Sequence, residues 1–139
     1  MACGTDFIER GTMSWFCCGG SWGPCGPAGG GACGGCQSGS LHAAWPNASA
    51  ACFDITRPDR CGKSLPRRGC GTVLHVTNRC NGQCTRVAIR DCGPRTQSFC
   101  GQNCCGGTCG SGRIIDLTPA AFSAIASLSA GVRPCRVDD

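Results

Sequence analysis

Two aspartates are the residues of this sequence best placed to do chemistry. Asp91 lies in "RDCGPR" at 90–95, and Asp116 lies in "GRIIDLTPAAF" at 112–122. Each lies beside an apolar, strand-like run, and such places commonly hold binding and catalytic side chains. The two are among only eight acidic residues in a chain of 139. Because a carboxyl group is the usual proton donor in glycan cleavage, Asp91 and Asp116 are candidate catalytic residues.

A structural role is the alternative interpretation of both aspartates. In a tight turn such as "DCGP", Asp91 would accept backbone hydrogen bonds, and Asp116 would order the chain as it enters a helix. The position of Asp116 just before a helix N-terminus also favours its ionised form. A proton donor at neutral pH needs a raised pKa instead. Unless burial outweighs the helix terminus, we therefore expect Asp116 to bind as a carboxylate and not to donate a proton.

Aromatic side chains that could stack on sugar rings are few, because the chain has three Trp, five Phe and no Tyr. Flat apolar rings offer the faces against which sugar rings pack. The aromatic candidates for binding a glycan are Trp15, Phe16, Trp22, Trp45 and Phe99.

Seventeen cysteines dominate the composition. Such density in a short chain is typical of a disulfide framework, which persists in oxidising compartments, so we expect a secreted protein with long disulfide-stapled loops. Pairs such as "CGGC" at 33–36 could be metal ligands, but His42 and His75 lie outside any zinc-finger spacing. We therefore expect no metal and no cofactor. Because seventeen is odd, at least one thiol is unpaired or joined to another molecule.

The net charge of +5 points to an anionic partner. Five basic residues gather in "RPDRCGKSLPRR" at 57–68, which would attract acidic cell-wall glycans or other anionic polymers. A solvated loop whose charges aid solubility explains the same cluster. No recognisable nucleic-acid module accompanies it, and no apolar run is long enough to cross a membrane. We expect a monomer made of one domain, residues 1–139.

Alternation of apolar and polar residues predicts β-strands in the second half of the chain. In "TRVAIR" the side chains of Val87 and Ile89 would point inward, and Asp91 continues this inward phase at the end of the strand. Asn81-Gly82 is the strongest short hairpin signal, so the strands on either side of it should pair antiparallel. The strands predicted in this way are 72–78, 85–90, 113–117 and 132–137.

One helix is predicted, over 118–131. Thr118 is a suitable N-cap, and Gly131 is suitable at the C-terminal end. The first half of the chain is less regular, and residues 17–50 are so rich in Cys and Gly that they predict a stapled loop. Within 41–56 we expect a short helical or turn segment followed by the strand-like "ACFDI".

The succession "GTVLHVTNRCNGQCTRVAIRDCGP … RIIDLTPAAFSAIASLSAGVRPCRV" resembles the rare lipoprotein A and expansin-like superfamily, which includes barwin-like plant proteins and family forty-five endoglucanases. The match is specific over 70–137, and "GTMSWF" at 11–16 resembles the first strand of these barrels. The resemblance implies a mainly β fold, a six-stranded double-psi β-barrel with one or two short helices. Residues 17–50 would be an insertion between its first two strands.

The resemblance also implies roles for individual residues. Asp116 falls on the aspartate of an "HFDL"-like motif that supplies the general acid in related hydrolases, and Asp91 falls on the aspartate of a "DRGP" motif. Thr12 falls on a first-strand threonine near the groove. Two departures count against hydrolysis, because Gly62 replaces the histidine of the lipoprotein enzymes and Phe16 replaces the catalytic base of the endoglucanases. An inverting hydrolase without its base cannot activate water.

Three functions follow as hypotheses. The first is a secreted protein that binds cell-wall polysaccharide, such as peptidoglycan or cellulose, in an open groove. The second is a glycan-cleaving enzyme of the lytic transglycosylase type, with Asp116 as its acid. The third is a defence protein or an inhibitor of a secreted cysteine protease that acts through an exposed loop within 17–50 or 95–112, because the same barrel resembles a papain inhibitor of soil bacteria. The residues expected to form the glycan site are Thr12, Trp15, Trp45, Asp91, Phe99 and Asp116.

Overall fold

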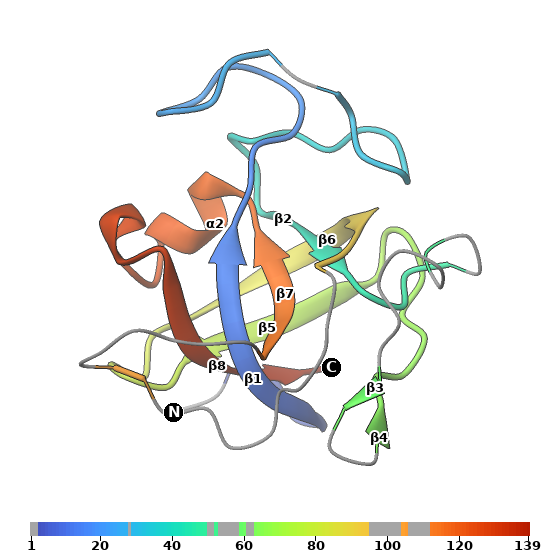
Figure 1. The fold of residues 1–139 in the computed structure, drawn as a ribbon, viewed down its shortest axis with the longest axis vertical. Helices are drawn as coiled ribbons and strands as arrows, with labels where there is room; N and C mark the ends of the chain where they lie inside the picture. Colours follow the sequence, from blue (N-terminus) through green and yellow to red (C-terminus); the bar gives the residue numbers. More distant parts are fainter. Residues whose placement is uncertain are drawn as a thin grey trace.

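The computed structural model describes most of the chain, and Figure 1 shows its fold. The described residues are 3–27, 29–49, 52, 59–60, 63–94, 104–105 and 112–139. The main sheet contains β1 (Phe7–Trp15), β2 (His42–Trp45), β5 (Val73–Asn78), β6 (Cys84–Cys92), β7 (Arg113–Leu117) and β8 (Val132–Asp138). The other described elements are a small sheet of β3 (Asp59–Arg60) and β4 (Lys63–Ser64), the helix α2 (Pro119–Ser123) and the 3-10 helix η2 (Leu128–Ala130).

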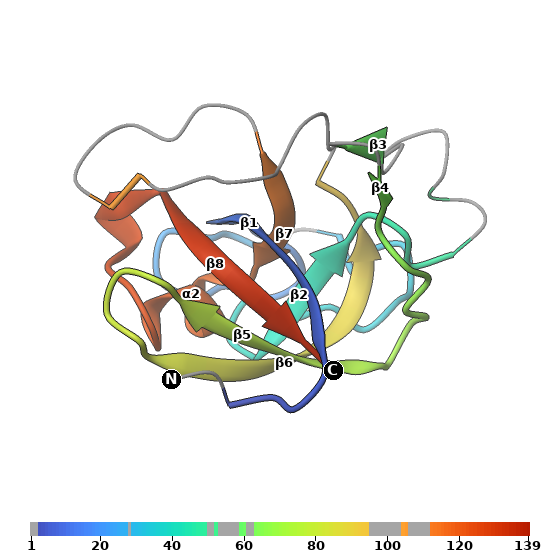
Figure 2. The ribbon, with the colours of Figure 1, turned by 90° about the horizontal axis from the view of Figure 1, so that it is seen from below.

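The strands of the main sheet close into a barrel in the order β1-β7-β2-β6-β5-β8. β1 pairs with β7 and β2 with β6 in parallel, while the other neighbouring pairs run antiparallel. Figure 2 shows β5 lying between β6 and β8. Closure gives every strand two neighbours, so the barrel itself has no edge strand. The mainly β, six-stranded barrel predicted from the sequence is confirmed.

β5 and β6 form the predicted antiparallel hairpin. Its turn contains Gly82, whose φ of 76° is the left-handed conformation that glycine adopts without strain. The side chains of Val87 and Ile89, predicted to point inward, are buried, and they belong to one core cluster shared by several strands and α2. Asp91 was predicted to continue this inward phase, but it is half-buried and lies outside the cluster, because the register between β2 and β6 shifts just before it. The largest fully buried side chains of that cluster are Trp45, Phe122, Met13, Leu74, Ile89, Ile114, Ile115, Leu117, Ile125, Val76 and Val87.

The predicted helix is much shorter than expected. Thr118 is its N-cap, as predicted, but α2 ends at Ser123 and a separate 3-10 turn, η2, follows. The carbonyl of Ile125 accepts hydrogen bonds from the side-chain amides of Asn78 at 2.8 Å and Asn81 at 3.0 Å. The hairpin therefore holds a carbonyl that a continuous helix would use for its own hydrogen bonding, and the chain turns instead.

The second barrel strand lies inside the segment for which the sequence predicts a loop. β2 occupies His42–Trp45, where a helical or turn segment is expected. Ala43 and Ala44 are buried between β6 and β7, and pairing on both sides outweighs the helix propensity of alanine. The loop after β1 therefore ends near residue 41 and not at 50. The strand-like "ACFDI" lies mostly outside the described residues.

The disulfide framework predicted from the cysteine density is confirmed. Among the described cysteines, Cys135 is free, and it is fully buried in β8. Burial raises the pKa of this thiol, which makes it unreactive. The described pairs are Cys3–Cys84, Cys17–Cys25, Cys18–Cys36, Cys33–Cys70, Cys52–Cys92 and Cys80–Cys105.

Candidate functional site

Four neighbouring strands bring the two candidate aspartates into one row. Ser14 of β1 lies opposite Asp116 of β7, and Asp116 lies opposite Ala44 of β2. Ala44 in turn lies opposite Asp91 of β6. We call Ser14, Asp116, Ala44 and Asp91 the carboxylate row. Adjacent strands are about 4.8 Å apart, so the backbones of the two aspartates, with one strand between them, are roughly 10 Å apart.

The carboxylate row faces away from the core cluster. Side chains alternate along a strand, so Met13, Ile115 and Leu117 point to the opposite face, where they are fully buried. On the face of the row, Ser14 is 5 % exposed and Ala44 is 2 % exposed, while the two aspartates are half-buried. The row is therefore a polar strip with limited access to water.

Burial raises the pKa of Asp116 because it disfavours the charged form. A hydrogen bond donated by the Ser14 hydroxyl and the charge of Arg113 lower this pKa in part, and the charge of Asp91 raises it further. Burial is the largest of these influences on the pKa of Asp116. The sequence left both an ionised and a protonated Asp116 open, and the raised pKa favours the protonated form that a proton donor requires.

Asp91 holds the loop that follows β1. Its Oδ1 accepts a hydrogen bond from the N–H of Ala32, in that loop, at 2.8 Å. The same oxygen accepts one from the N–H of Cys92, also at 2.8 Å. A structural role for Asp91 is the alternative that the sequence left open, and the structure supports it. The carboxylate orders both its own turn and a segment far away in the sequence.

The predicted sugar-binding side chains do not gather at the carboxylate row. Thr12 and Trp45 are fully buried, and the Trp45 indole N–H donates to the carbonyl of Pro66 at 3.0 Å. Trp15 is half-buried, and its indole N–H donates to a carbonyl of η2 at 3.0 Å. Phe99 lies outside the described residues. Trp45 therefore packs in the core cluster, whereas Thr12 is buried outside that cluster.

Ser14 is a site residue that the sequence prediction lacks. It contacts Asp116 directly, and it follows Thr12 by two residues in "GTMSWF". Alternate residues of a strand share a face, so a period of two from the predicted Thr12 would have identified Ser14. Its partnership with Asp116 depends on the parallel pairing of β1 and β7, which no local pattern predicts.

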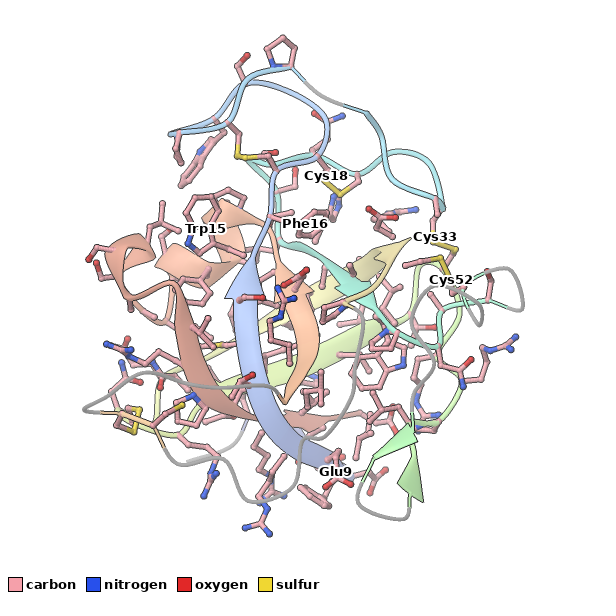
Figure 3. All side chains as sticks on the ribbon, in the orientation of Figure 1. Glu9, Trp15, Phe16, Cys18, Cys33 and Cys52 are labelled. Carbon is pink, nitrogen blue, oxygen red and sulfur yellow. A yellow bond between two sulfur atoms is a disulfide. The ribbon has the colours of Figure 1, made fainter. Side chains whose placement is uncertain are left out.

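The second feature of interest is the stapled loop, the name we give to residues 16–41. It lies beyond the ends of β1 and β7, at the top of Figure 1. Figure 3 shows Phe16 where the loop leaves β1, with the side chains of Cys18 and Cys33 in the loop itself. Two disulfides close the loop on itself and a third ties it to the segment before β5. These are Cys17–Cys25, Cys18–Cys36 and Cys33–Cys70.

Hydrogen bonds fix the base of the stapled loop. The N–H of Cys18 donates to the buried hydroxyl of Ser38 at 2.8 Å, and the N–H of Gln37 donates to Nδ1 of His42 at 3.0 Å. Burial and the charge of Arg90 lower the pKa of His42, which keeps this ring nitrogen unprotonated and able to accept. The loop is therefore ordered by covalent bonds, backbone contacts and side-chain acceptors together.

The outer part of the stapled loop is exposed and uncharged. None of residues 16–41 is Asp, Glu, Lys, Arg or His. Residues 20–24 are all exposed, and they include Trp22, whose side chain is 36 % exposed. The sequence indicates Trp22 among the aromatic candidates but places Trp45, and not Trp22, in the expected glycan site, whereas in the structure Trp45 is buried and Trp22 is exposed.

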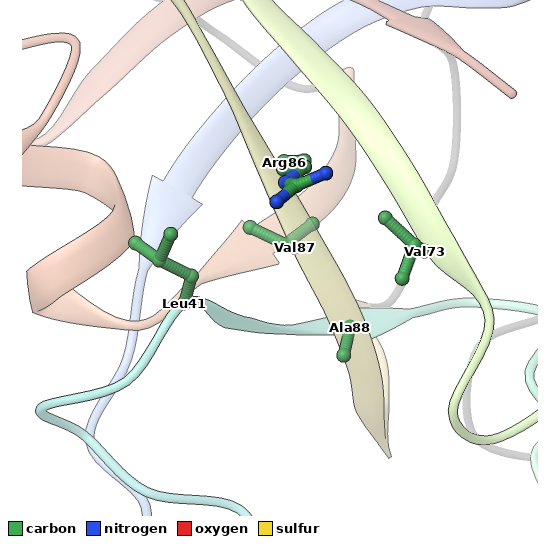
Figure 4. Close-up of a pocket in the computed structure, with 5 residues that line it drawn as sticks. All are labelled: Leu41, Val73, Arg86, Val87 and Ala88. Atoms are coloured by element: carbon green, nitrogen blue, oxygen red, sulfur yellow. The ribbon is translucent and has the colours of Figure 1, made fainter.

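A separate hollow of about 350 Å³ lies on the outside of β5 and β6. Figure 4 shows Leu41 and Val73 on either side of it, with Arg86 between them. Leu41 is 44 % exposed and Val73 is 49 % exposed. The hollow is lined by Leu41, Val73, Arg86, Val87 and Ala88, and no member of the carboxylate row is among them.

The described residues form neither a candidate metal centre nor a membrane-spanning helix. In that part of the chain, no group of three or more His, Cys, Asp or Glu side chains could hold a metal ion. No helix there is long and apolar enough to cross a membrane. The expectation that the protein needs no metal or cofactor stays a prediction.

Comparison with known proteins gives structural neighbours. No protein-family model and no curated protein sequence match the chain. A papain inhibitor from Streptomyces is similar with a TM-score of 0.51 and 26 % identity, over 96 % of this chain and 97 % of the inhibitor. A mutant Clavibacter michiganensis expansin in complex with cellohexaose gives a TM-score of 0.48 and 21 % identity, over 92 % of this chain and 48 % of the expansin. The expansin of the same organism without ligand gives a TM-score of 0.48 and 22 % identity, over the same shares of the two chains.

The two kinds of neighbour differ in how much of each the chain matches. This chain spans about half the length of the expansin and nearly the whole length of the papain inhibitor. The fold of this protein is the closed, mainly β, six-stranded barrel that the resemblance predicts.

Proposed function

We propose that this protein is a secreted inhibitor of papain-like cysteine proteases and that the stapled loop is its contact surface. The observation that carries the proposal is the loop, an exposed segment fixed by three disulfides. A loop that is already ordered loses little conformational entropy when it enters a partner's cleft. The likeness to the Streptomyces papain inhibitor over 97 % of that protein supports the same function.

The extracellular location belongs to the same proposal. The protein has many disulfides among its described residues, and such bonds persist in oxidising compartments. A stapled protein also resists local unfolding, which is the step that exposes a chain to proteolysis. An inhibitor that meets its protease outside the cell would need both properties.

In this proposal the carboxylate row has a structural role. Asp91 is hydrogen-bonded to Ala32 in the stapled loop, and Asp116 is hydrogen-bonded to Ser14. Two of the residues expected to bind sugar, Thr12 and Trp45, have no exposed surface. An inhibitor that works by occlusion needs no proton donor, so the row serves to position the loop.

Inhibition of papain tests the proposed function. We would follow hydrolysis of a chromogenic peptide by papain in the presence of wild-type protein or of Asp116→Asn, with trypsin as an unrelated serine protease. We expect both proteins to inhibit papain equally and trypsin not at all. If wild-type protein inhibits neither papain nor other secreted cysteine proteases, the proposal is wrong.

Binding or cleavage of a cell-wall glycan at the carboxylate row is the second candidate function. The observation that favours it is the raised pKa of Asp116, which faces a second carboxylate across the small side chain of Ala44. Asp116 would donate its proton to the glycosidic oxygen. In a lytic transglycosylase the sugar's own hydroxyl is the nucleophile, so no second catalytic carboxylate is needed.

Incubation with peptidoglycan and with cellulose tests this second function. Both binding and the release of soluble fragments would be followed for wild type and for Asp116→Asn. Fragments that appear with wild type and vanish with the variant would establish cleavage. If the wild-type protein binds neither polymer, both the binding and the cleavage hypotheses are wrong.

A further inference from the structure

We propose that the turn Trp22–Cys25 is the part of the stapled loop that enters the protease cleft and that the indole of Trp22 is its anchor. This inference rests on the proposed function, because it names the contact residue of the same inhibitor. Its partner is the active-site cleft of a papain-like protease, and its mode of action is reversible occlusion.

The turn is fixed on both sides. The N–H of Trp22 donates to the carbonyl of Cys25 at 3.0 Å, and the N–H of Cys25 donates back to the carbonyl of Trp22 at 2.9 Å. Between them Gly23 has a φ of 52°, in the left-handed region, and Pro24 has its φ fixed by its ring. The disulfide Cys17–Cys25 joins the turn to the stem of the loop. The tip is therefore preorganised, so little entropy is lost when it binds.

The indole of Trp22 packs against Gly39. A Cβ atom at Gly39 would lie 2.8 Å from Cδ1 of the indole, so the ring packs there only because this position is glycine. The indole is still 36 % exposed, whereas Trp45 is fully buried and Trp15 is half-buried. A tryptophan that is held in place yet exposed is the type of residue that dominates binding energy in protein interfaces. The structure therefore favours Trp22 over the other two tryptophans as the anchor.

The geometry of the turn also predicts that the protease does not cleave it. A catalytic thiolate attacks a peptide bond only when the bond lies in a near-attack arrangement. The bond between Gly23 and Pro24 lies at the apex of a turn closed by two hydrogen bonds, and Pro24 has no N–H. We therefore expect the chain to stay intact and the protease cysteine to stay unacylated during inhibition.

Because the stapled loop carries no charge, the ionic-strength dependence of inhibition shows whether this loop makes the contact. Because residues 16–41 carry no ionisable acid, base or histidine, binding through this loop should change little with ionic strength. Binding driven by the net charge of +5 would weaken as salt is added. The salt dependence of inhibition therefore separates the loop from the arginine-rich surfaces of the same protein.

A fluorine label on tryptophan tests the contact without any substitution. Protein labelled with 5-fluorotryptophan should give three ¹⁹F resonances, one for each tryptophan. On addition of papain, we expect the Trp22 resonance to shift or broaden while those of Trp15 and Trp45 change little. If papain is inhibited but the Trp22 resonance does not change, the anchor is elsewhere. If the resonance responds to cellohexaose and not to papain, the turn is a sugar-stacking surface and the inference is wrong.

Inhibition constants of three variants test the anchor by function. Trp22→Ala should raise the inhibition constant for papain at least about 30-fold, as expected for a tryptophan hot spot. Gly39→Ala keeps the indole but displaces it from its packed position, so it should raise the inhibition constant by a smaller factor. Phe7→Ala is the matched control, because Phe7 is 47 % exposed at the start of β1, where it contacts Arg136. We expect this control to inhibit within about twofold of wild type, below the 1.4 kcal/mol that makes a tenfold change.

The outcomes separate the inference from the proposed function. If Trp22→Ala inhibits as wild type does, Trp22 is not the anchor, although the protein remains a protease inhibitor. If wild-type protein does not inhibit at all, the proposed function and the inference are both wrong. Circular dichroism would reveal whether Trp22→Ala folds. If it does not fold, Gly39→Ala and the fluorine label still test whether Trp22 is the anchor.

Discussion

The stapled loop and the carboxylate row lie next to each other, but they are held in place in opposite ways. Strand register alone sets Ser14, Asp116, Ala44 and Asp91 side by side. The loop has almost no regular structure, and three disulfides order it instead. The row is polar and largely covered, whereas the loop is uncharged and exposed at its outer end. A rigid, exposed surface suits recognition, while a covered polar strip suits support.

The two regions meet at Asp91. Its carboxylate belongs to the row by register, yet it holds the backbone of Ala32 in the loop. A change in the row can therefore disturb the loop. Variants that act on one region, on the other, or on this junction should differ in whether they alter stability, inhibition or both.

Within the barrel, Trp45→Ala should cause the largest loss of stability. The indole is fully buried and donates to the carbonyl of Pro66, so its removal leaves a cavity and an unpaired acceptor. Losses of about 3–5 kcal/mol are typical of such substitutions. Guanidinium denaturation would measure the change, with Trp22→Ala as an exposed control that should lose far less. A Trp45→Ala variant as stable as wild type would contradict the burial of this residue.

Within the stapled loop, replacing Cys18 and Cys36 together by serine should reduce both stability and inhibition. Their disulfide closes a segment with a sequence separation of 18 residues, and a bond of this kind stabilises by roughly 3 kcal/mol. The matched control replaces Cys3 and Cys84, which join the N-terminus to β6. We expect the control to lose stability but still to inhibit papain. Equal loss of inhibition in both variants would show that the effect is global.

At the junction, Asp91→Ala should have an intermediate effect. Loss of a charged acceptor that serves Ala32 and Cys92 should destabilise the protein by about 1.5 kcal/mol. The amide of Ala32 should also exchange its hydrogen faster, which NMR can follow residue by residue. Asp91→Asn retains a carbonyl acceptor, so its stability and its exchange rate at Ala32 should lie between those of Asp91→Ala and wild type. Unchanged exchange at Ala32 would show that Asp91 does not hold the loop.

Asp116→Asn should change the pH dependence of stability more than stability itself. The pKa of Asp116 is raised in the folded state, so the unfolded chain releases this proton at lower pH than the folded one. Wild-type protein therefore loses this contribution to stability as pH rises from the ordinary value of 3.8 through the raised value. Asparagine does not titrate. The unfolding free energy of wild type minus that of Asp116→Asn should therefore decrease as the pH rises over this interval. A difference that rises with pH would mean that the pKa is lowered.

Much of the barrel could be predicted from the sequence because its strands alternate. Val87 and Ile89 point inward as expected, and the hairpin at Gly82 forms where Asn-Gly indicates it. β2 was missed because its alanines carry no strand signal, and only pairing with β6 and β7 makes it a strand. The helix was predicted too long because Ile125 has partners in the hairpin, and those contacts are invisible in a local pattern.

The candidate site was predictable only in part. Asp91 and Asp116 were identified from their places beside strands, and register brings them together. Trp15 and Trp45 could not be separated from Trp22 by sequence, because composition does not say which faces of a closed barrel are covered. The same limit applies to the cysteines, whose density predicts a framework but whose pairing depends on the fold.

Amide hydrogen exchange in the presence of papain tests most directly whether the loop, and not the row, is the recognition surface. Exchange would be compared for the free protein, for the protein with papain and for the protein with cellohexaose. We predict slower exchange over residues 19–25 with papain and no change over 113–117 with either addition. Slower exchange over 90–92 and 113–117 with cellohexaose, with residues 19–25 unaffected by papain, would contradict this assignment and place recognition in the carboxylate row.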